Sequence, residues 1–189
     1  MRGREIKILN LSEKEKGYLF GLFAGDGYKV YDKNSRHYHV EFYLNSVKDR
    51  DIVRFLICIL NKLGCHSILY QDKRYNCVRV RVYSKQLFSL LTKNIYLKNK
   101  SKYFSLGFVS GVIDSEGHVD GKKSSIDVVN TNKRLLMEIK RFLGSMSIKT
   151  SLSERQKSRL DTLKSYRMYI PVSFKNTHHI SIKVERRSR

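Results

Sequence analysis

Two carboxylates occupy matching places in this sequence, each at the end of an apolar stretch and directly before a glycine. Asp26 precedes Gly27, and Glu116 precedes Gly117 about half a chain length later. Carboxylate oxygens are the hard ligands that Mg²⁺ prefers. A pair of them holding divalent metal on a phosphate-binding protein is what two-metal phosphodiester hydrolysis needs. The competing interpretation is structural, because acid–glycine pairs are common turn material and glycine often follows the last turn of a helix.

Small residues recur every four positions in the stretches that lead to both acids. They are Gly17, Gly21, Gly25, Gly107, Gly111 and Ser115. Positions i, i+4 and i+8 stack along one face of a helix, and a face without side chains lets two helices cross closely. This spacing explains why the helices tolerate glycines that each cost about 1 kcal/mol relative to alanine. We therefore expect the two helices to pack together and to bring their C-terminal ends, with both acids, close to each other.

The segments that follow the two acids repeat in the same order. Each half has a strand-like run that reaches an asparagine, then an amphipathic helix, then a strand of alternating character. The expected elements are 36–46, 51–65 and 76–84 in the first half, and 124–131, 133–148 and 165–173 in the second. A two-fold repeat of this kind indicates a pseudo-dimer with its interface on the pseudo-axis. The alternation of 124–130 does not phase onto 40–45, so the sequence leaves open which residues of that strand face outward.

The charge balance points to a polyanionic partner. The 189 residues include 38 Lys and Arg against 17 Asp and Glu, which gives a net charge of +21. Nucleic acid is the first candidate, an anionic membrane surface the second, and a merely soluble basic protein the third. The three cysteines form no CxxC pair, which fits a reducing intracellular setting. The sequence has no signal-peptide pattern and no apolar window long enough to span a membrane, so we expect a protein that is neither secreted nor membrane-bound.

At this point the residues resemble a known family. The stretches LFGLFAGDG (19–27) and VSGVIDSEG (109–117) look like the two motifs of a single-chain LAGLIDADG homing endonuclease. The resemblance covers essentially the whole chain and implies an α+β fold of two αββαββα half-domains, 1–97 and 98–189. The two motif helices would pack at the centre, and two curved antiparallel sheets would form a saddle in the major groove of DNA.

The resemblance also implies an activity. Family members of this kind are monomers that cut a long target in double-stranded DNA across the minor groove and leave short 3′ overhangs. Asp26 and Glu116 match the acids that bind the catalytic Mg²⁺ (or Mn²⁺), two or three ions in all, and the backbone carbonyls of Gly25 and Ser115 lie where carbonyls often help. Gly21 and Gly111, with Gly25 and Ser115, match the helix interface.

The chain departs from the family pattern at several places. The earlier acid of the motif is Ala24 in the first half and Asp114 in the second, a position that usually serves the helix interface. In place of a glutamine near the metal we expect Asn45 and Asn130. For the usual central lysine the best match is Lys100, with Lys98 and Lys102 as alternates, and a solvated basic run is an equally good interpretation of all three. The second-half equivalent would lie near 183–189, which aligns poorly.

Outward residues of the expected strands are candidates for reading bases. They are Arg79, Arg81, Tyr83, Arg167 and Tyr169, together with His37, His39, Glu41 and Tyr43 if Tyr38, Val40 and Phe42 are core. Further basic residues that we expect to contact DNA are Lys29, Arg36, Arg74 and Lys122. The two histidines could be read as a metal pair, but the sequence places no cysteine or acid to complete such a site.

Two other functions stay open on the same fold. One is an RNA maturase that assists splicing of an intron, and the other is a DNA-binding module without catalysis. Retention of both acids argues against each of them as the sole function. We expect an intracellular protein that works with its host genome, in the cytoplasm or nucleoid of an archaeon or in an organelle.

Overall fold

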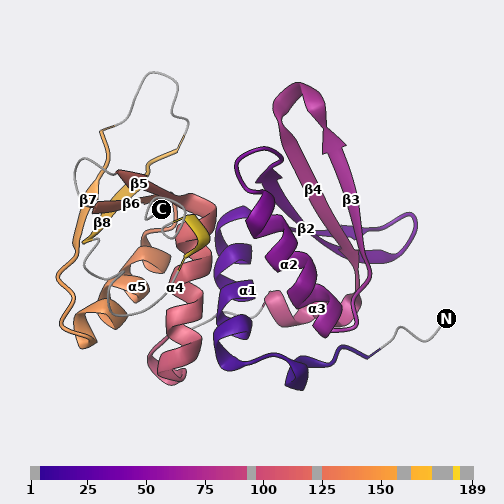
Figure 1. Cartoon of the computed structure of the whole chain (residues 1–189), viewed down its shortest axis with the longest axis horizontal. Helices are drawn as coiled ribbons and strands as arrows, with labels where there is room; N and C mark the ends of the chain where they lie inside the picture. Colours follow the sequence, from indigo (N-terminus) through magenta and orange to yellow (C-terminus); the bar gives the residue numbers. More distant parts are fainter. Residues whose placement is uncertain (1–4, 93–96, 121–124, 157–162, 172–180, 184–189) are drawn as a thin grey trace.

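Two long helices stand side by side at the centre of the molecule, and each leads directly into a sheet (Figure 1). The computed structural model describes residues 5–92, 97–120, 125–156, 163–171 and 181–183. The first half has α1 (Glu13–Asp26), β1 (Gly27–Asp32), β2 (His37–Asn45), α2 (Arg50–Lys62), β3 (Ser67–Asp72), β4 (Cys77–Tyr83) and α3 (Lys85–Leu91). The second half has α4 (Lys102–Glu116), β5 (Gly117–Asp120), β6 (Ser125–Asn130), α5 (Lys133–Ser145), β7 (Ser151–Glu154) and β8 (Tyr166–Pro171). Short 3₁₀ turns lie at Ile8–Asn10, Lys73–Tyr75 and Leu97–Asn99.

Both central helices begin at a serine cap and end without a conventional glycine cap. The Glu15 amide donates to Ser12 Oγ and the Ser12 amide donates to Glu15, which forms a capping box at the start of α1. At the other end Gly27 and Gly117 have extended backbone, with φ of −86° and −81°. Each helix therefore runs straight into a strand, and neither glycine forms a turn at the helix end.

The close crossing of α1 and α4 confirms the expectation from the small residues. A Cβ atom on Gly21 would lie 3.0 Å from Phe108 Cα and closer still to the Phe108 carbonyl oxygen. A Cβ on Gly107 would lie 2.9 Å from the Tyr18 amide nitrogen. Real Cβ atoms do not approach backbone this closely, so the two helices touch backbone to backbone. The whole run from Phe104 to Asp114 on α4 is buried.

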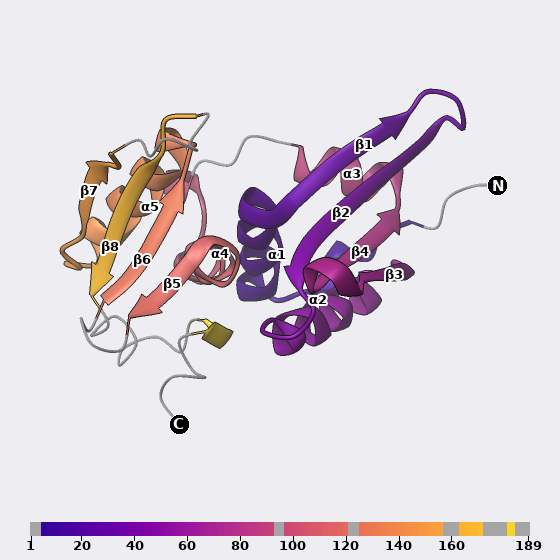
Figure 2. The same cartoon turned by 90° about the horizontal axis from the view of Figure 1, so that it is seen from above.

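The two sheets have the same topology, which confirms the α+β pseudo-two-fold repeat. The strand orders are β1-β2-β4-β3 and β5-β6-β8-β7, with every neighbouring pair antiparallel. Figure 2 shows one sheet on each side of the α1–α4 pair. Each half has its own apolar core, one built around Leu22, Phe42 and Leu56 and the other around Val112, Val128 and Leu136.

The register of the strands resolves the phase mismatch between the two halves. Gly27 pairs with Phe42 in the first sheet, and Gly117 pairs with Val128 in the second, so Val128 is the counterpart of Phe42. Counting on two residues, Asn130 is the counterpart of Leu44. The asparagines that end the two strands are therefore offset by one position and lie on opposite faces of their strands.

Of the segments that the structure describes, no helix is long and apolar enough to cross a membrane.

Replacing Gly21 by Ala should destabilise the protein, because the new methyl group must displace the backbone of α4. We expect a loss of about 1–3 kcal/mol in the free energy of unfolding, measured by urea titration. Gly144 in α5 is the matched control, since a Cβ there meets nothing within 4 Å. Gly144→Ala should stabilise by about 0.5–1 kcal/mol. Equal effects of the two changes would contradict the backbone contact.

Candidate active site and nucleic-acid interface

The structure brings Asp26 and Glu116 together at the ends of the two central helices. A Cβ on Gly25 would lie 2.9 Å from Glu116 Cγ, so the Glu116 side chain passes directly beside the last turn of α1. Burial, followed by the negative charge of Glu116, raises the pKa of Asp26 to about 7. Asp49, at the start of α2, adds to this rise, and sequence analysis did not identify it. Burial also raises the pKa of Glu116.

The two asparagines have different surroundings. Asn130 Nδ2 donates a hydrogen bond of 2.9 Å to Glu116 Oε1, and this bond opposes the rise in the pKa of Glu116. Asn45 instead caps the turn after β2, where its Oδ1 accepts from the amides of Val47 and Lys48. The one-position offset explains the difference. The first-half counterpart of Asn130 is the apolar Leu44, so within the described part of the chain Asn130 is the one of the two asparagines that hydrogen-bonds an acid of the pair.

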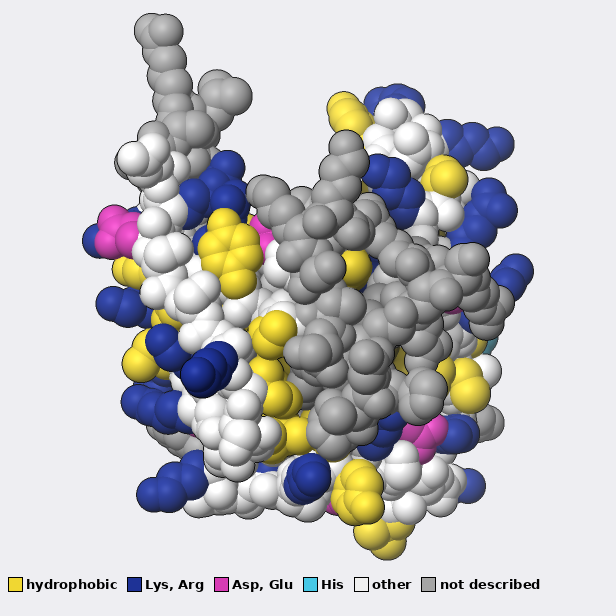
Figure 3. All heavy atoms as spheres, turned by 60° about the vertical axis from the view of Figure 1, so that its left-hand side comes forward, with side chains coloured by type: hydrophobic (Ala, Val, Ile, Leu, Met, Phe, Trp, Pro, Cys, Tyr) yellow, Lys and Arg dark blue, Asp and Glu magenta, His cyan; other side chains and the backbone are white. Residues whose placement is uncertain are grey.

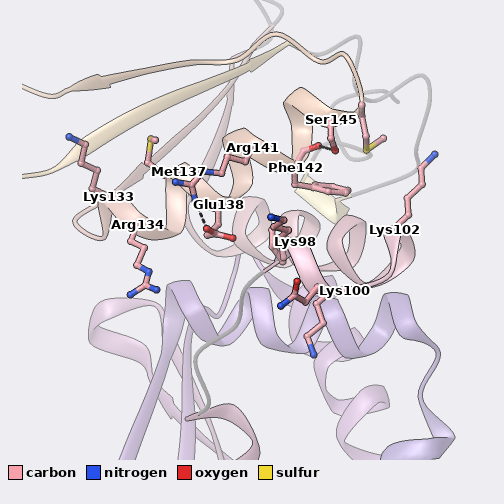
Figure 4. Close-up of a pocket in the computed structure, with 13 residues that line it drawn as sticks. Lys98, Lys100, Lys102, Lys133, Arg134, Met137, Glu138, Arg141, Phe142 and Ser145 are labelled. Atoms are coloured by element: carbon pink, nitrogen blue, oxygen red, sulfur yellow. Dashed lines mark hydrogen bonds and ion pairs between the residues drawn. The ribbon is translucent and has the colours of Figure 1, made fainter.

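Lys100 lies at the other end of α4 from the acids. A helix rises 1.5 Å per residue, so the start of α4 is about 20 Å from Glu116. Lys98, Lys100 and Lys102 line a groove of about 1390 Å³ between this end of α4 and α5 (Figure 4). The Lys100 ammonium sits 5.3 Å from the centre of the Phe104 ring. This placement argues against the assignment of these three lysines to the acid pair.

The lysine beside the acids comes from the C-terminal segment. Lys183 Nζ donates to the carbonyl oxygen of Ser115 at 3.1 Å and lies 3.5 Å from that of Gly117. Its charge lowers the pKa of both Asp26 and Glu116, against the larger effect of burial. Lys183 is the first residue of the segment 183–189, near which the second-half equivalent of the central lysine was expected.

Asp114 stands where the first motif has Ala24, and its side chain makes several hydrogen bonds. Its carboxylate is fully buried and accepts from Tyr18, Ser181 and the amides of Ile182 and Lys183. The Tyr18 contact fits the expected role in the helix interface. The others tie the C-terminal segment to α4.

The donor set at the acid pair fits a divalent cation bound jointly with a substrate. Mg²⁺ is commonly held by one or two carboxylates plus phosphate oxygens and water, and Asp26 and Glu116 supply that number. Among the described residues there is no cluster of three or more His, Cys, Asp or Glu side chains that would hold a metal alone. Of the two expected carbonyl ligands, the Ser115 oxygen accepts from Lys183, while that of Gly25 belongs to the same turn as Asp26.

The outer face of the first sheet carries a network of charged and aromatic side chains around a buried acid. Its members are His39, Glu41, Tyr43, Arg79, Arg81 and Tyr83. The side chains of Val40, Phe42 and Leu44 point to the core on the other face, as expected.

Glu41 is the centre of this network and is only 2% exposed. It accepts from Arg81 Nε and from the Tyr43 hydroxyl at 2.5 Å each, and Arg79 lies at 3.8 Å. Burial alone would raise the pKa of Glu41, but these donors outweigh it and lower the pKa. The Tyr70 ring stacks under both guanidinium groups, at 4.7 Å for Arg79 and 5.0 Å for Arg81.

The remaining predicted contact residues of the first sheet lie at its margins. His37 begins β2, and its ring is 5.9 Å from that of Tyr83. Arg36 and Arg74 are exposed in the two hairpin turns, and Arg74 pairs with Asp72. Lys29 pairs across from Val40, which places it on the core-facing side of the edge strand rather than on the outer face.

The outer face of the second sheet is less basic. Arg167 and Tyr169 lie on it, and Arg167 donates to the Tyr169 hydroxyl at 3.2 Å. Asp127 pairs across from Tyr169, while Val129 lies opposite Arg167. Lys122 lies outside the described residues. Figure 3 shows Lys and Arg side chains on both the left and the right side of the face that it draws.

Comparison with known proteins places this architecture in a family. A family model described as a LAGLIDADG-like domain matches residues 13–102 and again residues 103–179. No curated protein sequence matches the chain significantly.

Solved structures share the fold at low sequence identity. The homing endonuclease I-DmoI in complex with DNA and Ca is 21% identical, with a TM-score of 0.69 over 93% of this chain and 97% of that one. I-DmoI with DNA and Mn gives a TM-score of 0.66 at 22% identity, over 87% and 96% of the two chains. Full-length WhiA from Thermatoga maritima gives a TM-score of 0.66 at 15% identity, over 94% of this chain and 59% of that one. The two matched repeats, each ending its central helix in an acid, show that the chain belongs to the LAGLIDADG-like domain family.

Proposed function

We propose that this protein is a site-specific, divalent-metal-dependent endonuclease that cuts both strands of a DNA duplex. The observation that carries the proposal is the pair Asp26 and Glu116, contributed one from each repeat and held side by side between two sheets. The shared fold does not by itself establish cleavage, because one fold can serve different functions and I-DmoI and WhiA are only 21% and 15% identical to this chain. The proposal therefore rests on the acids and their surroundings.

The electrostatics of the acid pair favour a bound cation. Two half-buried carboxylates repel each other, and this repulsion contributes to the raised pKa of Asp26. A divalent cation would relieve the repulsion, and it would supply activation of water and neutralisation of the leaving oxygen. We propose Mg²⁺ or Mn²⁺, in view of the I-DmoI complexes with target DNA and either metal.

The residues of this chain would perform the other parts of the reaction. The two sheets hold the duplex by its major groove, while basic side chains at their margins contact phosphates. Asn130 holds Glu116 in place through its hydrogen bond. The pseudo-two-fold axis of the protein matches the local two-fold symmetry of a duplex, so one monomer presents one acid to each strand. Cuts across the minor groove would leave short 3′ overhangs.

Replacing Asp26 by Asn and Glu116 by Gln together should abolish cleavage and leave DNA binding. The wild-type protein would be incubated with Mg²⁺ and a randomised or genomic duplex library, and the cut ends sequenced. We expect cuts that recur at one long sequence and are absent with the double variant. Asp51→Asn, on the first turn of α2, is the matched control and should cut as the wild type does. A folded wild-type protein that cuts no duplex with any divalent metal would refute the proposal.

The pH dependence of stability should report the Asp26 carboxyl directly. The folded protein holds this proton up to a pKa of about 7, whereas the unfolded chain releases it near 3.9. Because the folded state binds the proton more tightly, this group costs the wild type stability as pH rises from about 4 to about 7. In metal-free buffer, the stability advantage of Asp26→Asn should grow over that interval and then level off. A difference between the two proteins that is constant from pH 4 to 8 would contradict the raised pKa.

Glu41→Gln should weaken discrimination between DNA sequences rather than DNA binding itself. The change removes the negative charge that holds Arg81 and turns one of the two acceptor oxygens into a donor, so the guanidinium is held less firmly in its orientation toward a base edge. We expect the ratio of target to non-target affinity to fall about tenfold, within the 1–3 kcal/mol of one bidentate base contact. Binding to non-target duplex should be no weaker, since a negative charge is lost.

The control for this change is Glu138→Gln, which removes another Glu–Arg pair, on α5. It should leave the affinity ratio unchanged in the same competition titration. A Glu41→Gln protein with unaltered discrimination would show that the arginine network does not read bases.

A further inference from the structure

A basic groove lies in the second half of the protein, and neither acid of the pair lines it. The groove runs between α5 and the segment that leads into α4, and its volume is about 1390 Å³ (Figure 4). Six of its thirteen lining residues are Lys or Arg, and they come from both of these elements. The one acid among the lining residues is Glu138, which already pairs with Arg141 at 2.5 Å. The groove therefore carries a large surplus of positive charge.

The groove and the outer face of the second sheet lie on opposite sides of that sheet. The helix α5 packs against the sheet through Leu136, Ile139 and Leu143, which are buried together with Val128 of β6. Figure 2 shows α5 behind the strands. Arg167 lies on the other face, because successive side chains of a strand alternate between faces. A ligand in the groove and a duplex on the outer faces of the sheets would therefore use different residues.

Two lysines of the groove are available to bind an anion. Lys98 and Lys102 are exposed, and among the described residues no acid forms an ion pair with either. Lys133, at the other end of the groove, lies over the Tyr166 ring at 5.3 Å from its centre. Each phosphate that such an ammonium group neutralises releases condensed counterions, which favours a polyanionic ligand.

Apolar side chains alternate with the cations along α5. Met137, Phe142 and Met146 line the groove, and each is half-buried. A single strand of nucleic acid uses this combination, because its bases stack on aromatic side chains while its phosphates meet cations. A duplex keeps its bases stacked inside, and an anionic membrane is too broad and flat to enter a groove. Neither of these two ligands would contact the apolar side chains.

We propose that this groove binds a single-stranded polynucleotide, with a base on the Phe142 ring and phosphates on Lys98 and Lys102. The groove follows α5 from Lys133 to Met146, about 20 Å at 1.5 Å per residue, so it holds a short stretch of strand. It is a second nucleic-acid site, separate from the acid pair, and it does not depend on cleavage. An acidic peptide is the competing ligand, since it offers negative charge without bases that stack.

Fluorescence anisotropy of labelled single strands in metal-free buffer tests the two lysines. The probes are about 12 nucleotides long, one of RNA and one of DNA, and are titrated with the full chain. Lys98→Gln with Lys102→Gln should weaken binding about tenfold and reduce the slope of log affinity against log salt by about 1.4, since each phosphate contact contributes about 0.7. Lys140→Gln with Lys149→Gln removes the same charge outside the groove and should leave the slope unchanged.

Phe142→Leu tests the stacked base, because it keeps an apolar side chain and removes the aromatic ring. It should weaken single-strand binding about tenfold and leave the salt slope unchanged. The same titration is run with an acidic peptide of equal net charge, which should bind more weakly. A peptide that binds as tightly as the single strands, whether or not Phe142 is replaced, would overturn the proposal.

Competition with unlabelled duplex separates the groove from the two sheets. We expect duplex to bind and to leave the single-stranded probe in place. Displacement of the probe by duplex, or equal weakening by both pairs of lysine changes, would overturn the groove as the site. Tighter binding of the RNA probe or of the DNA probe would identify the strand, and either result supports the proposal.

The groove and the proposed endonuclease function can fail separately. Single-strand binding that needs Lys98, Lys102 and Phe142, in a wild-type protein that cuts no duplex, would leave the groove standing and refute the endonuclease. Cleavage of a duplex by a protein that binds neither single-stranded probe would refute the groove alone.

Discussion

The backbone contact between α1 and α4 is the constraint on which the rest of the structure depends. Gly17, Gly21, Gly107 and Gly111 let the helices approach until a methyl group would not fit between them. This separation brings the two helix ends together, and with them the acids that each end carries. Because both helices continue directly into strands, the same contact also sets the two sheets on opposite sides of one axis. The candidate active site and the surface beside it are therefore consequences of one packing interaction.

The two repeats share one fold, but the side chains around Glu116 differ from those around Asp26. Asn130 replaces the apolar Leu44, and Asp114 replaces Ala24. Lys183 approaches the carbonyls on both sides of Glu116. Two carboxylates that occupy equivalent backbone positions consequently differ in hydrogen bonding and in neighbouring charge. Burial and the charge of Glu116 raise the pKa of Asp26 to about 7, whereas the Asn130 hydrogen bond opposes the rise in the pKa of Glu116.

The spacing of residues along the sequence was sufficient to predict the contact between the central helices and the outward face of one strand. The four-residue spacing of small residues predicted the helix contact, and the alternation of residues 76–84 predicted which side of β4 faces outward. The errors came from features that depend on register or on distant sequence. Asn45 and Asn130 look equivalent until strand pairing shows their offset. For the second-half lysine the sequence indicated only the segment 183–189, and the contacts of Asp114 with residues 181–183 bring Lys183 to the acids. Lys100 has the expected sequence context but lies about 20 Å away.

We propose that one acid from each repeat forms a single metal centre that acts on DNA. The most direct measurement is anomalous diffraction from Mn²⁺ in crystals of the protein bound to a duplex selected from a random library. We expect manganese peaks in contact with both the Asp26 and Glu116 carboxylates and with phosphates of the bound strands. Manganese bound elsewhere, with these two carboxylates free of metal in the DNA complex, would contradict it.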